Sequence, residues 1–244
     1  MLAALDLQLF QAFNGWAGRS YAFDRAVVSL TNMHLVKTAP LIAAFCWYWF
    51  NPDRRRGGPD DTELRHNRHF LIFSSLAAAV LACGLSRLVQ NVMWERPRPI
   101  NDPTLGAIRP LGLSEDYLAN YSSFPSDNAA MTFALATGLF LIARGPGIAA
   151  FLWALLVACL PRVFAGFHYP SDILGGAVLG VAVTLLVVRR AWLRRPYEWA
   201  IGLHDRRPGL FYAAGFIAAY QMTTFFGDLR ELGEKTAIFL RATL

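Results

Sequence analysis

Charged residues are scarce in this chain of 244 residues: only 16% are Asp, Glu, Lys or Arg, whereas 55% are hydrophobic. An average soluble domain has roughly a quarter charged residues. The apolar residues gather in runs such as 70–89 and 147–160, which are too long and too apolar for a helix that buries only one side. Each crossing of a hydrocarbon core about 30 Å thick needs about 20 such residues. The composition excludes a disordered chain and indicates a polytopic membrane protein.

Cysteine is also scarce, and no internal repeat is visible. Cys46, Cys83 and Cys159 each lie inside an apolar run, and no two of them have C-x-x-C spacing. This excludes a disulfide framework and a cysteine metal cluster. The net charge of +6 comes from residues at the ends of apolar runs, without a basic stripe on a soluble face. We therefore expect membrane lipids, and no nucleic acid, as partners.

The hydrophobic pattern predicts an all-α fold, a bundle of six transmembrane helices in a single membrane domain over residues 1–244. The six predicted spans are 33–50, 69–94, 126–143, 147–166, 171–189 and 209–227. The first seventeen residues place Leu5, Leu9 and Phe13 at helical spacing and Asp6 and Asn14 elsewhere around the helix, which predicts an interfacial helix. A cleaved signal peptide would need a basic start and a longer apolar stretch.

Six crossings place the loops alternately on two sides, and the arginines are unevenly divided between them. One side receives twelve: Arg54, Arg55, Arg56, Arg65, Arg68, Arg144, Arg189, Arg190, Arg194, Arg195, Arg206 and Arg207. By the positive-inside rule that side is cytoplasmic. Both termini and the loop 95–125 then face outward, toward the periplasm of a bacterium. We predict a multi-pass protein of the bacterial inner membrane.

Three outward segments bring polar residues to one level of the membrane, where ionisable groups are costly and usually functional. They are residues 91–99, 124–128 and 162–172. Pro125 and Pro170 each precede a serine, which predicts two helix starts with Ser126 and Ser171 as N-caps. Helix N-termini bind anions, and forked guanidinium groups such as those of Arg98 and Arg162 suit a tetrahedral oxyanion. These segments predict a phosphate site.

His168 lies four residues before Asp172. We expect the Asp172 carboxylate to accept the Nδ1–H of the ring, which would fix the tautomer and leave Nε2 free to attack. The predicted chemistry is nucleophilic catalysis.

The order of these motifs resembles the type 2 phosphatidic acid phosphatase (PAP2) superfamily, whose pattern is K-x6-R-P, then P-S-G-H, then S-R-x5-H-x3-D. The resemblance covers about residues 69–190, which leaves the span 209–227 as an addition. It implies phosphate binding by Arg98, Ser126 and Arg162, a phosphohistidine at His168 and no metal or other cofactor. Asp127 replaces the glycine of P-S-G-H, which is similar to the undecaprenyl-pyrophosphate branch; the resemblance implies that it joins the phosphate-binding residues.

The sequence departs from the pattern at Asn91, Pro161 and Asn128. In the family, the histidine at the Asn128 position protonates the leaving oxygen, which an amide cannot do. A phosphate monoester leaves a diphosphate without such help more readily than an alkoxide leaves a monoester. Asn128 therefore favours a lipid diphosphate as substrate. Alternatively, Asp127 or His34 supplies the proton.

Two further arginines are candidates for the same site. Arg87 lies one helical turn before Asn91 and either restores the charge of the missing lysine or pairs with another buried group. Arg96 is a candidate for contacts around the site or with a lipid headgroup.

The resemblance implies a metal-independent lipid phosphatase that hydrolyses a polyprenyl diphosphate, with undecaprenyl pyrophosphate as first choice, in cell-envelope biogenesis. Three alternatives stay open: a lipid phosphotransferase, a phosphatidic acid or phosphatidylglycerol phosphate phosphatase, and a catalytically silent protein that binds or transports a lipid carrier. The sequence leaves the oligomeric state unknown.

Overall fold

A computed structural model of the chain describes residues 2–51, 60–92, 96–113, 122–190, 193–229, 231–232 and 235–236. All the regular secondary structure in these ranges is helical, which confirms the predicted all-α class. The chain divides into two compact units, Met1–Ala191 and Trp192–Leu244, which are described separately. That they form a single membrane domain stays a prediction.

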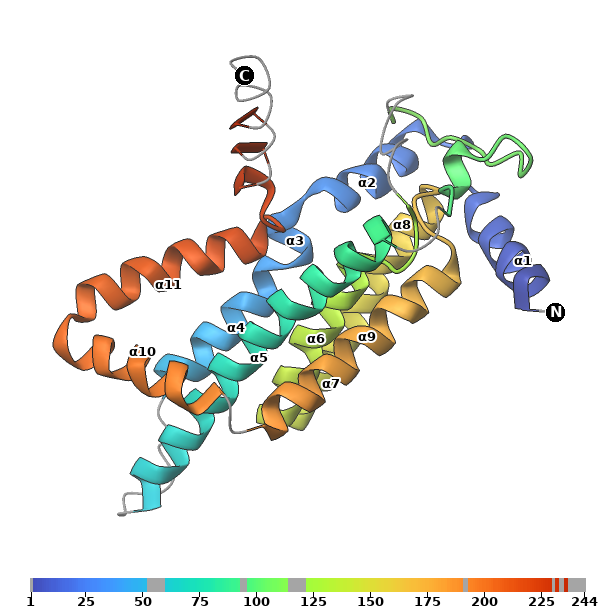
Figure 1. The fold of residues 1–244 in the computed structure, drawn as a ribbon. Coiled ribbons are helices and arrows are strands. Elements are labelled where there is room, and N and C mark those ends of the chain that lie inside the picture. Colours follow the sequence, from blue (N-terminus) through green and yellow to red (C-terminus); the bar gives the residue numbers. More distant parts are fainter. Residues whose placement is uncertain are drawn as a thin grey trace. The chain divides into compact units, whose positions relative to one another are not determined.

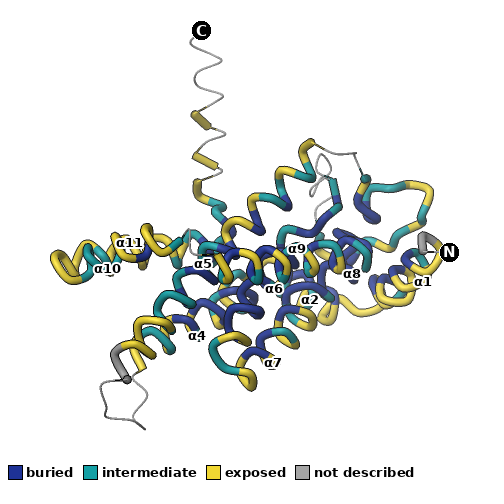
Figure 2. The backbone as a smooth tube through the Cα atoms, turned by 60° about the horizontal axis from the view of Figure 1, so that its bottom comes forward, coloured by how far each residue is buried: buried dark blue, intermediate teal, exposed yellow. Residues whose placement is uncertain are grey.

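Three helices make the centre of the first unit. Figure 1 shows α5 (Asp60–Val92), α6 (Asp127–Ile142) and α9 (Pro170–Arg189) side by side, and each of them packs against the other two. Buried residues line the contacts between these helices, whereas exposed residues lie on their outer faces (Figure 2). The central helix α6 is buried along most of its length, as expected for a helix enclosed by neighbours.

The fourth predicted span is a helix of three parts. It begins as α7 (Arg144–Trp153), continues through one π-helical stretch, η2 (Ala154–Cys159), and ends as α8 (Leu160–Phe164). Both α7 and η2 pack against α6. Because α8 carries Arg162, the packing of this helix on α6 sets the position of one predicted phosphate ligand.

Two glycines allow α6 and α9 to approach closely. A Cβ atom at Gly176 would lie 2.3 Å from the carbonyl oxygen of Ser126, and one at Gly180 would lie 2.2 Å from that of Ala130. Neither distance is possible for real atoms, so any larger residue would push the helices apart. The start of α9 therefore stays beside the start of α6, where two of the predicted motifs lie.

The N-terminal part of the first unit has four helices, which are α1 (Leu2–Asn14), α2 (Tyr21–Asn32), α3 (His34–Lys37) and α4 (Ala39–Phe50). Helix α1 packs against α8 and α9, α2 packs against α8, and α4 packs against α5 and α6. A short 3₁₀ turn, η1 (Pro99–Asn101), follows the second arginine of the R-P-R-P sequence.

Helix α1 turns its polar side toward the protein. Asp6 and Asn14 are buried together with Phe10, whereas the large apolar residues Leu5 and Phe13 are exposed. The Asn14 amide donates to the carbonyl oxygens of Ile108 and Phe164, at 2.8 and 2.9 Å. An apolar outer face suits a lipid environment, and the position of α1 at the membrane interface stays a prediction.

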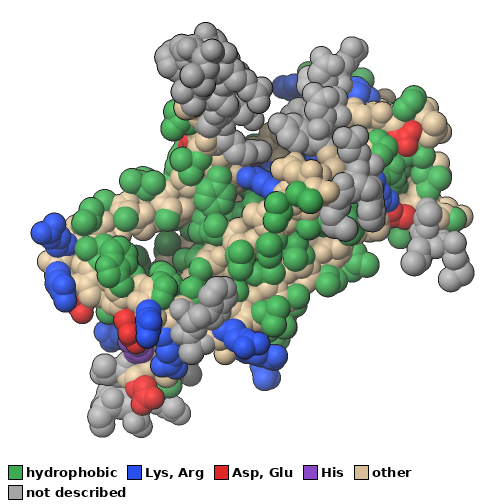
Figure 3. Space-filling model, in the orientation of Figure 1, with side chains coloured by type: hydrophobic (Ala, Val, Ile, Leu, Met, Phe, Trp, Pro, Cys, Tyr) green, Lys and Arg blue, Asp and Glu red, His purple; other side chains and the backbone are tan. Residues whose placement is uncertain are grey.

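Three helical stretches in the described part of the chain are long and apolar enough to cross a membrane: Glu63–Val92, Arg144–Phe164 and Pro170–Arg189. Two further predicted spans coincide with the shorter apolar helices Ala39–Phe50 and Asp127–Ile142. Hydrophobic side chains cover the middle of α5 and α9 on the face in Figure 3, and basic side chains gather where α9 ends. These features suit a membrane protein, and the number of six spans stays a prediction.

The second unit contains α10 (Arg194–Arg206) and α11 (Pro208–Thr223), which pack against each other. Trp199, Phe216 and Ile217 are exposed on this pair. The sixth predicted span falls on α11. Parts of four predictions lie outside the described residues: the end of the span 69–94, residues 93–95 of the polar segment 91–99, residues 95 and 114–121 of the outward loop 95–125, and Arg54–Arg56 in the arginine count.

Candidate active site

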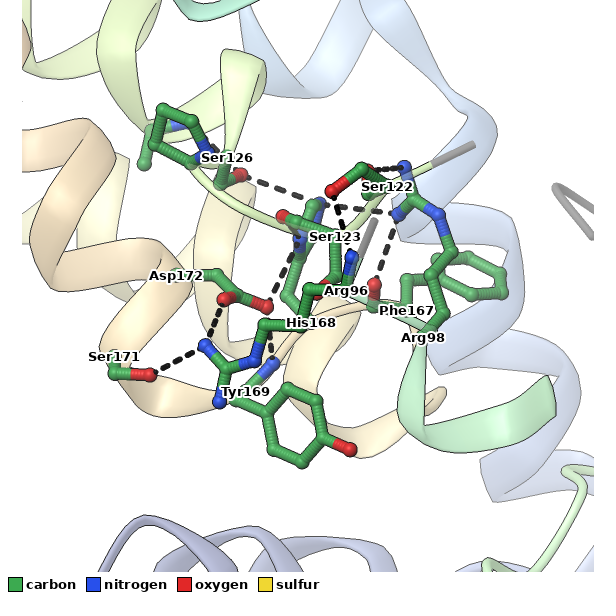
Figure 4. A network of polar contacts seen from close by, with 12 residues as sticks. Arg96, Arg98, Ser122, Ser123, Ser126, Phe167, His168, Tyr169, Ser171 and Asp172 are labelled. Carbon is green, nitrogen blue, oxygen red and sulfur yellow. Dashed lines mark hydrogen bonds and ion pairs between the residues drawn. The ribbon is translucent and has the colours of Figure 1, made fainter. Parts of the chain in front are cut away.

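The three predicted motifs meet at one end of the α5–α6–α9 core. The chain before η1, the chain before α6 and the loop between α8 and α9 converge on His168, whose side chain is fully buried (Figure 4). The structure thus brings together the residues that the sequence placed in three separate segments.

Gly166 shapes the loop that carries His168. Its φ angle of 75° lies in the left-handed region that favours glycine. A Cβ atom there would also lie 2.9 Å from the Cβ atom of Ile100. Because the Ile100 N–H donates to the Gly166 carbonyl oxygen at 2.9 Å, the loop is fixed beside the segment that follows Arg98.

The hydrogen bonds of His168 define its tautomer. Nδ1 lies 2.9 Å from the carbonyl oxygen of Ser123, and since that oxygen only accepts, Nδ1 carries the proton. Nε2 lies 3.3 Å from Ser126 Oγ and 3.5 Å from Arg98 Nη1. The Nε2 lone pair therefore faces a serine hydroxyl and a guanidinium, the groups expected to hold a phosphoryl oxygen.

The acceptor for Nδ1–H differs from the expected one. The nearest oxygen of Asp172, Oδ2, is 3.7 Å from Nδ1, longer than a hydrogen bond, although it is close enough for an ion pair once the ring is charged. The Ser123 carbonyl thus orients the ring in the neutral state. Sequence reasoning missed Ser123 because a backbone acceptor has no signature in the side-chain pattern.

The pKa of the His168 imidazole is lowered from 6.5 to about 4, chiefly by burial and also by the charges of Arg98 and Arg162, whereas Asp172 opposes these effects. The ring is therefore neutral at pH 7. A neutral imidazole with Nδ1 protonated is the form that attacks through Nε2.

Asp172 lies in the first turn of α9 and is fully buried. Its Oδ2 accepts from the Tyr169 N–H at 2.8 Å, and its Oδ1 binds Arg96. The helix begins at Pro170 with Tyr169 as N-cap, so the prediction of Ser171 as N-cap was wrong. The reason is tertiary: the Ser171 hydroxyl donates to Asp6 at 2.6 Å instead of capping the helix.

Arg96 joins Asp172 to the N-terminal helix. Besides Asp172, its guanidinium donates to Ser171 Oγ at 2.9 Å and to Asp6 Oδ2 at 2.8 Å, and it lies 4.0 Å from the centre of the Tyr169 ring. Asp6 also accepts from the Ser171 N–H at 2.8 Å. Arg96 therefore positions the carboxylate beside His168. No sequence pattern connects Asp6, at the start of the chain, with this site.

Arg98 and Arg162 are both buried, with 5% and 6% of their surfaces exposed. Arg98 donates to the Phe167 carbonyl oxygen at 2.8 Å and to that of Ser122 at 3.3 Å, which holds it beside His168. Arg162 lies over the Phe167 ring, 5.3 Å from its centre, and its buried Nε has no hydrogen-bond partner among the described residues. A buried donor without a partner is costly, and a bound phosphate would satisfy it.

Ser126 is the N-cap of α6, as predicted from the preceding proline. Its Oγ accepts from the Ala129 N–H at 3.4 Å while facing His168, and its own N–H donates to the Asp172 carbonyl oxygen at 3.0 Å. The last contact ties the starts of α6 and α9 together.

Asp127 pairs with Arg87, whose Nε lies 3.2 Å from Asp127 Oδ2. Arg87 was expected either to restore the charge of the missing lysine or to pair with another buried group, and the structure shows the pairing. Asp127 Oδ1 also accepts from the Asn128 N–H at 2.8 Å and from the Asn128 amide at 3.0 Å. Three donors hold this carboxylate as an acceptor, which does not suit a proton donor.

Lys37 is a further residue of the site region that the sequence did not indicate. Its side chain is buried, and Nζ donates to the Thr31 carbonyl oxygen at 2.6 Å and to Asn128 Oδ1 at 3.4 Å. The available signal was an ammonium group inside the predicted span 33–50. Asn91, at the position of the family's lysine, is exposed in the last turn of α5.

Within the described ranges, no group of three or more His, Cys, Asp or Glu side chains lies close enough together to hold a metal ion. Arg98 and Arg162 are two buried cations of the site.

The region that contains the three motifs is also similar in sequence to known proteins. A family model described as the PAP2 superfamily matches residues 68–196, just over half of the chain. The undecaprenyl-diphosphatase BcrC of Bacillus subtilis (strain 168) is 25% identical over 193 residues, which cover 79% of this chain and 88% of that protein. The bacitracin transport permease protein BcrC of Bacillus licheniformis is 37% identical over 68 residues, covering 27% of this chain and 32% of that protein. The crystal structure of Aquifex aeolicus LpxE aligns with a TM-score of 0.48 and 23% identity, covering 76% of this chain and 96% of that one.

Proposed function

The chain belongs to the PAP2 superfamily, and from this membership we propose that it hydrolyses a polyprenyl diphosphate, with undecaprenyl diphosphate as first choice, through a phosphohistidine at His168. The proposal rests on the groups that surround His168 Nε2. His168 Nε2 is unprotonated, buried and directed at Ser126 Oγ and Arg98, 3.3 and 3.5 Å away. A nucleophile among phosphate ligands supports phosphoryl transfer.

In the first step, Nε2 attacks the terminal phosphorus while Arg98, Arg162 and Ser126 bind its oxygens. The bond between this phosphorus and the bridging oxygen breaks, and the lipid monophosphate leaves. The phosphorylated ring is then a cation, because Nδ1 keeps the proton that it donates to Ser123. Asp172, 3.7 Å from Nδ1, stabilises that cation. In the second step, water attacks the phosphorus and breaks the P–N bond, which releases inorganic phosphate.

The choice of a diphosphate rests on Asn128 and on one relative. An asparagine stands where the family has its general acid, and a lipid monophosphate is a better leaving group than an alkoxide. The relative from Bacillus subtilis is named an undecaprenyl-diphosphatase, and it covers most of this chain. Both observations favour the same substrate class by independent arguments.

We place the site on the outer side of the bacterial inner membrane, because the arginines that flank the predicted spans lie mainly on the opposite side. A lipid carrier released from envelope synthesis presents its diphosphate on that side. The proposed catalysis uses arginines for the charge of the phosphate and needs no metal ion.

The test is phosphate release by purified protein in detergent from undecaprenyl diphosphate, undecaprenyl phosphate and phosphatidic acid, each with a chelator and without it. We expect the highest kcat/KM with the diphosphate, unchanged by the chelator. His168→Gln, which keeps a polar side chain of similar size, should reduce turnover to background. A preference for phosphatidic acid contradicts the substrate class. Turnover by His168→Gln contradicts the assignment of His168 as the nucleophile. Transfer of the phosphoryl group to an added alcohol instead of water indicates a phosphotransferase.

A further inference from the structure

We propose that Lys37 is the proton donor of this site and takes the role that a histidine has at the position of Asn128. The inference rests on the proposed function, since it assigns one more residue to the same phosphohistidine reaction. With a proton donor at Lys37, the choice of a diphosphate rests on the relative from Bacillus subtilis and no longer on a missing acid at Asn128. It starts from the contact between Lys37 Nζ and Asn128 Oδ1, at 3.4 Å, between two side chains that lie 91 positions apart in the sequence.

Asn128 is short, and the space beyond its amide group is occupied by the ammonium group of Lys37. The amide group of Asn128 uses Nδ2 to donate to Asp127 Oδ1, at 3.0 Å, so Oδ1 points toward Lys37. A histidine is longer than an asparagine and would extend beyond Oδ1, into the region that the Lys37 ammonium occupies. The ammonium therefore lies where the ring of the family's histidine would end, and it carries the transferable proton that an amide lacks.

Burial of the Lys37 ammonium group costs free energy, which indicates that the group has a function. The residue is only 1% exposed, and the contacts that fix its ammonium include two neutral oxygens, of Thr31 and Asn128. Three ionisable groups on neighbouring elements lie around it, namely Arg162 of α8, Asp127 of α6 and Cys159 of η2, and of these Arg162 and Asp127 act on it through their charges. Arg162 is also a phosphate ligand in the proposed mechanism, so Lys37 interacts electrostatically with a residue of the phosphate site.

The choice of lysine is informative in this chain. Of its 23 lysine and arginine residues, only two are lysines, and the other one, Lys235, is exposed and pairs with Glu231. Arginine keeps its proton in proteins, whereas a buried lysine is able to release one. A purely electrostatic role would be met equally well by an arginine, the residue that the chain uses almost everywhere else.

The proton balance closes over the reaction. As His168 Nε2 bonds to phosphorus and the bridging P–O bond breaks, the leaving oxygen takes a proton from the Lys37 ammonium, which becomes a neutral amine. When water attacks the phosphohistidine, the amine takes a proton from the water. The hydroxyl stays on the phosphorus, the P–N bond breaks, and both Lys37 and His168 return to their starting forms.

The test compares Lys37→Met, Lys37→Arg and the control Lys235→Met on two substrates, undecaprenyl diphosphate and undecaprenyl phosphate. General acid catalysis contributes typically about 10²- to 10⁴-fold. We expect both Lys37 variants to lose about 10²-fold or more in kcat with the monophosphate, whose leaving group is poor, and clearly less with the diphosphate. The control should match wild type. Because Lys37→Arg keeps the charge and not the transferable proton, it should fail as Lys37→Met does.

A rescue variant separates chemistry from folding. In the double variant Lys37→Met with Asn128→His, the imidazole ring extends into the space that the lysine side chain has left. We expect the double variant to be at least ten-fold more active on the monophosphate than Lys37→Met alone. Its activity should fall as the pH rises and the new imidazole loses its proton. If Lys37→Arg is as active as wild type with the monophosphate, only the charge at this position matters, and the inference is overturned. Equal losses on both substrates, or no rescue, overturn it too. Absence of phosphate release by wild type from both substrates overturns the proposed function, and the inference with it.

Discussion

The Nδ1–H of His168 is bound by the Ser123 carbonyl oxygen at 2.9 Å, and the Asp172 carboxylate lies farther away, at 3.7 Å. The two acceptors therefore have different tasks. The carbonyl oxygen fixes the ring before the reaction, whereas the carboxylate stabilises the ring after phosphorylation, when it is positively charged.

This division predicts a graded effect of Asp172→Asn. The asparagine keeps the size of the side chain and leaves the Ser123 contact in place, so the tautomer stays correct. The lost charge raises the free energy of the phosphorylated state, and we expect kcat to fall by about 10- to 100-fold, which corresponds to roughly 1.4 to 2.7 kcal/mol. Phosphate release compared with the inactive His168→Gln measures this. If Asp172→Asn is as inactive as His168→Gln, the carboxylate is needed to orient the ring as well.

The low pKa of His168, about 4, predicts the acid limb of the pH profile. The active form is the neutral ring, so activity is present above this pKa and is lost as the pH falls through it. We expect kcat/KM to have an enzyme limb near pH 4 instead of 6.5. Substrate ionisation adds a limb that differs between diphosphate and monophosphate, so the limb common to both substrates belongs to the enzyme. A common limb near pH 6.5 would contradict the effect of burial.

The same pKa has a consequence for stability. In the unfolded chain, the ring takes up a proton near pH 6.5, whereas in the folded protein it does so near pH 4. Between these values the unfolded state binds more protons, so the folded state loses stability as the pH falls through this window. Thermal unfolding in detergent at pH 7 and pH 4.5 should show a lower midpoint at pH 4.5, and the difference should be smaller for His168→Gln.

Arg96→Met tests the link between Asp172 and the N-terminal helix. The substitution leaves the buried charges of Asp172 and Asp6 without their common cation. We expect a loss of about 3 kcal/mol of stability, the lower end of the range for a broken buried pair, because Arg96 itself is partly exposed. Activity should fall together with the midpoint of unfolding. Arg65→Met, at an exposed arginine of α5, is the control and should leave both unchanged. A stable and fully active Arg96→Met protein would show that the network has no role in positioning Asp172.

The predicted topology is tested by reporter fusions. A reporter after Leu113 should be exposed on the outer side of the membrane, and one after Arg195 should lie in the cytoplasm, because the arginine-rich loops stay inside. The reverse result for both fusions would place His168 on the cytoplasmic side and contradict the recycling of a carrier from outside.

The sequence predicted the convergence of the three motifs because each motif stands at the end of an apolar run, and helix ends on one side of a membrane share one level. It also predicted the N-cap Ser126, since local turn chemistry decides a helix start when nothing else competes. At Ser171, a tertiary hydrogen bond to Asp6 competes with the capping tendency, and the local rule failed.

The contacts that the sequence did not predict have a common physical origin. The Ser123 carbonyl is a backbone group, and the pairing of Arg96 with Asp6 joins residues 90 positions apart. Both depend on how the segments between the apolar runs pack, which spacing does not specify. Lys37 was detectable in principle, because an ammonium within a predicted span is a functional candidate by cost alone.

The contact of Asp6 with Ser171, across 165 positions, also bears on the order in which the protein is made. Synthesis proceeds from the N-terminus, so α1 leaves the ribosome long before the residues that its carboxylate binds. A nascent chain that stops short of residue 171 lacks both the Asp172 carboxylate beside His168 and the Ser171 group that Asp6 binds. The first helix to be synthesised is thus among the last to find its place, and the enzyme becomes competent only after α9 has been added.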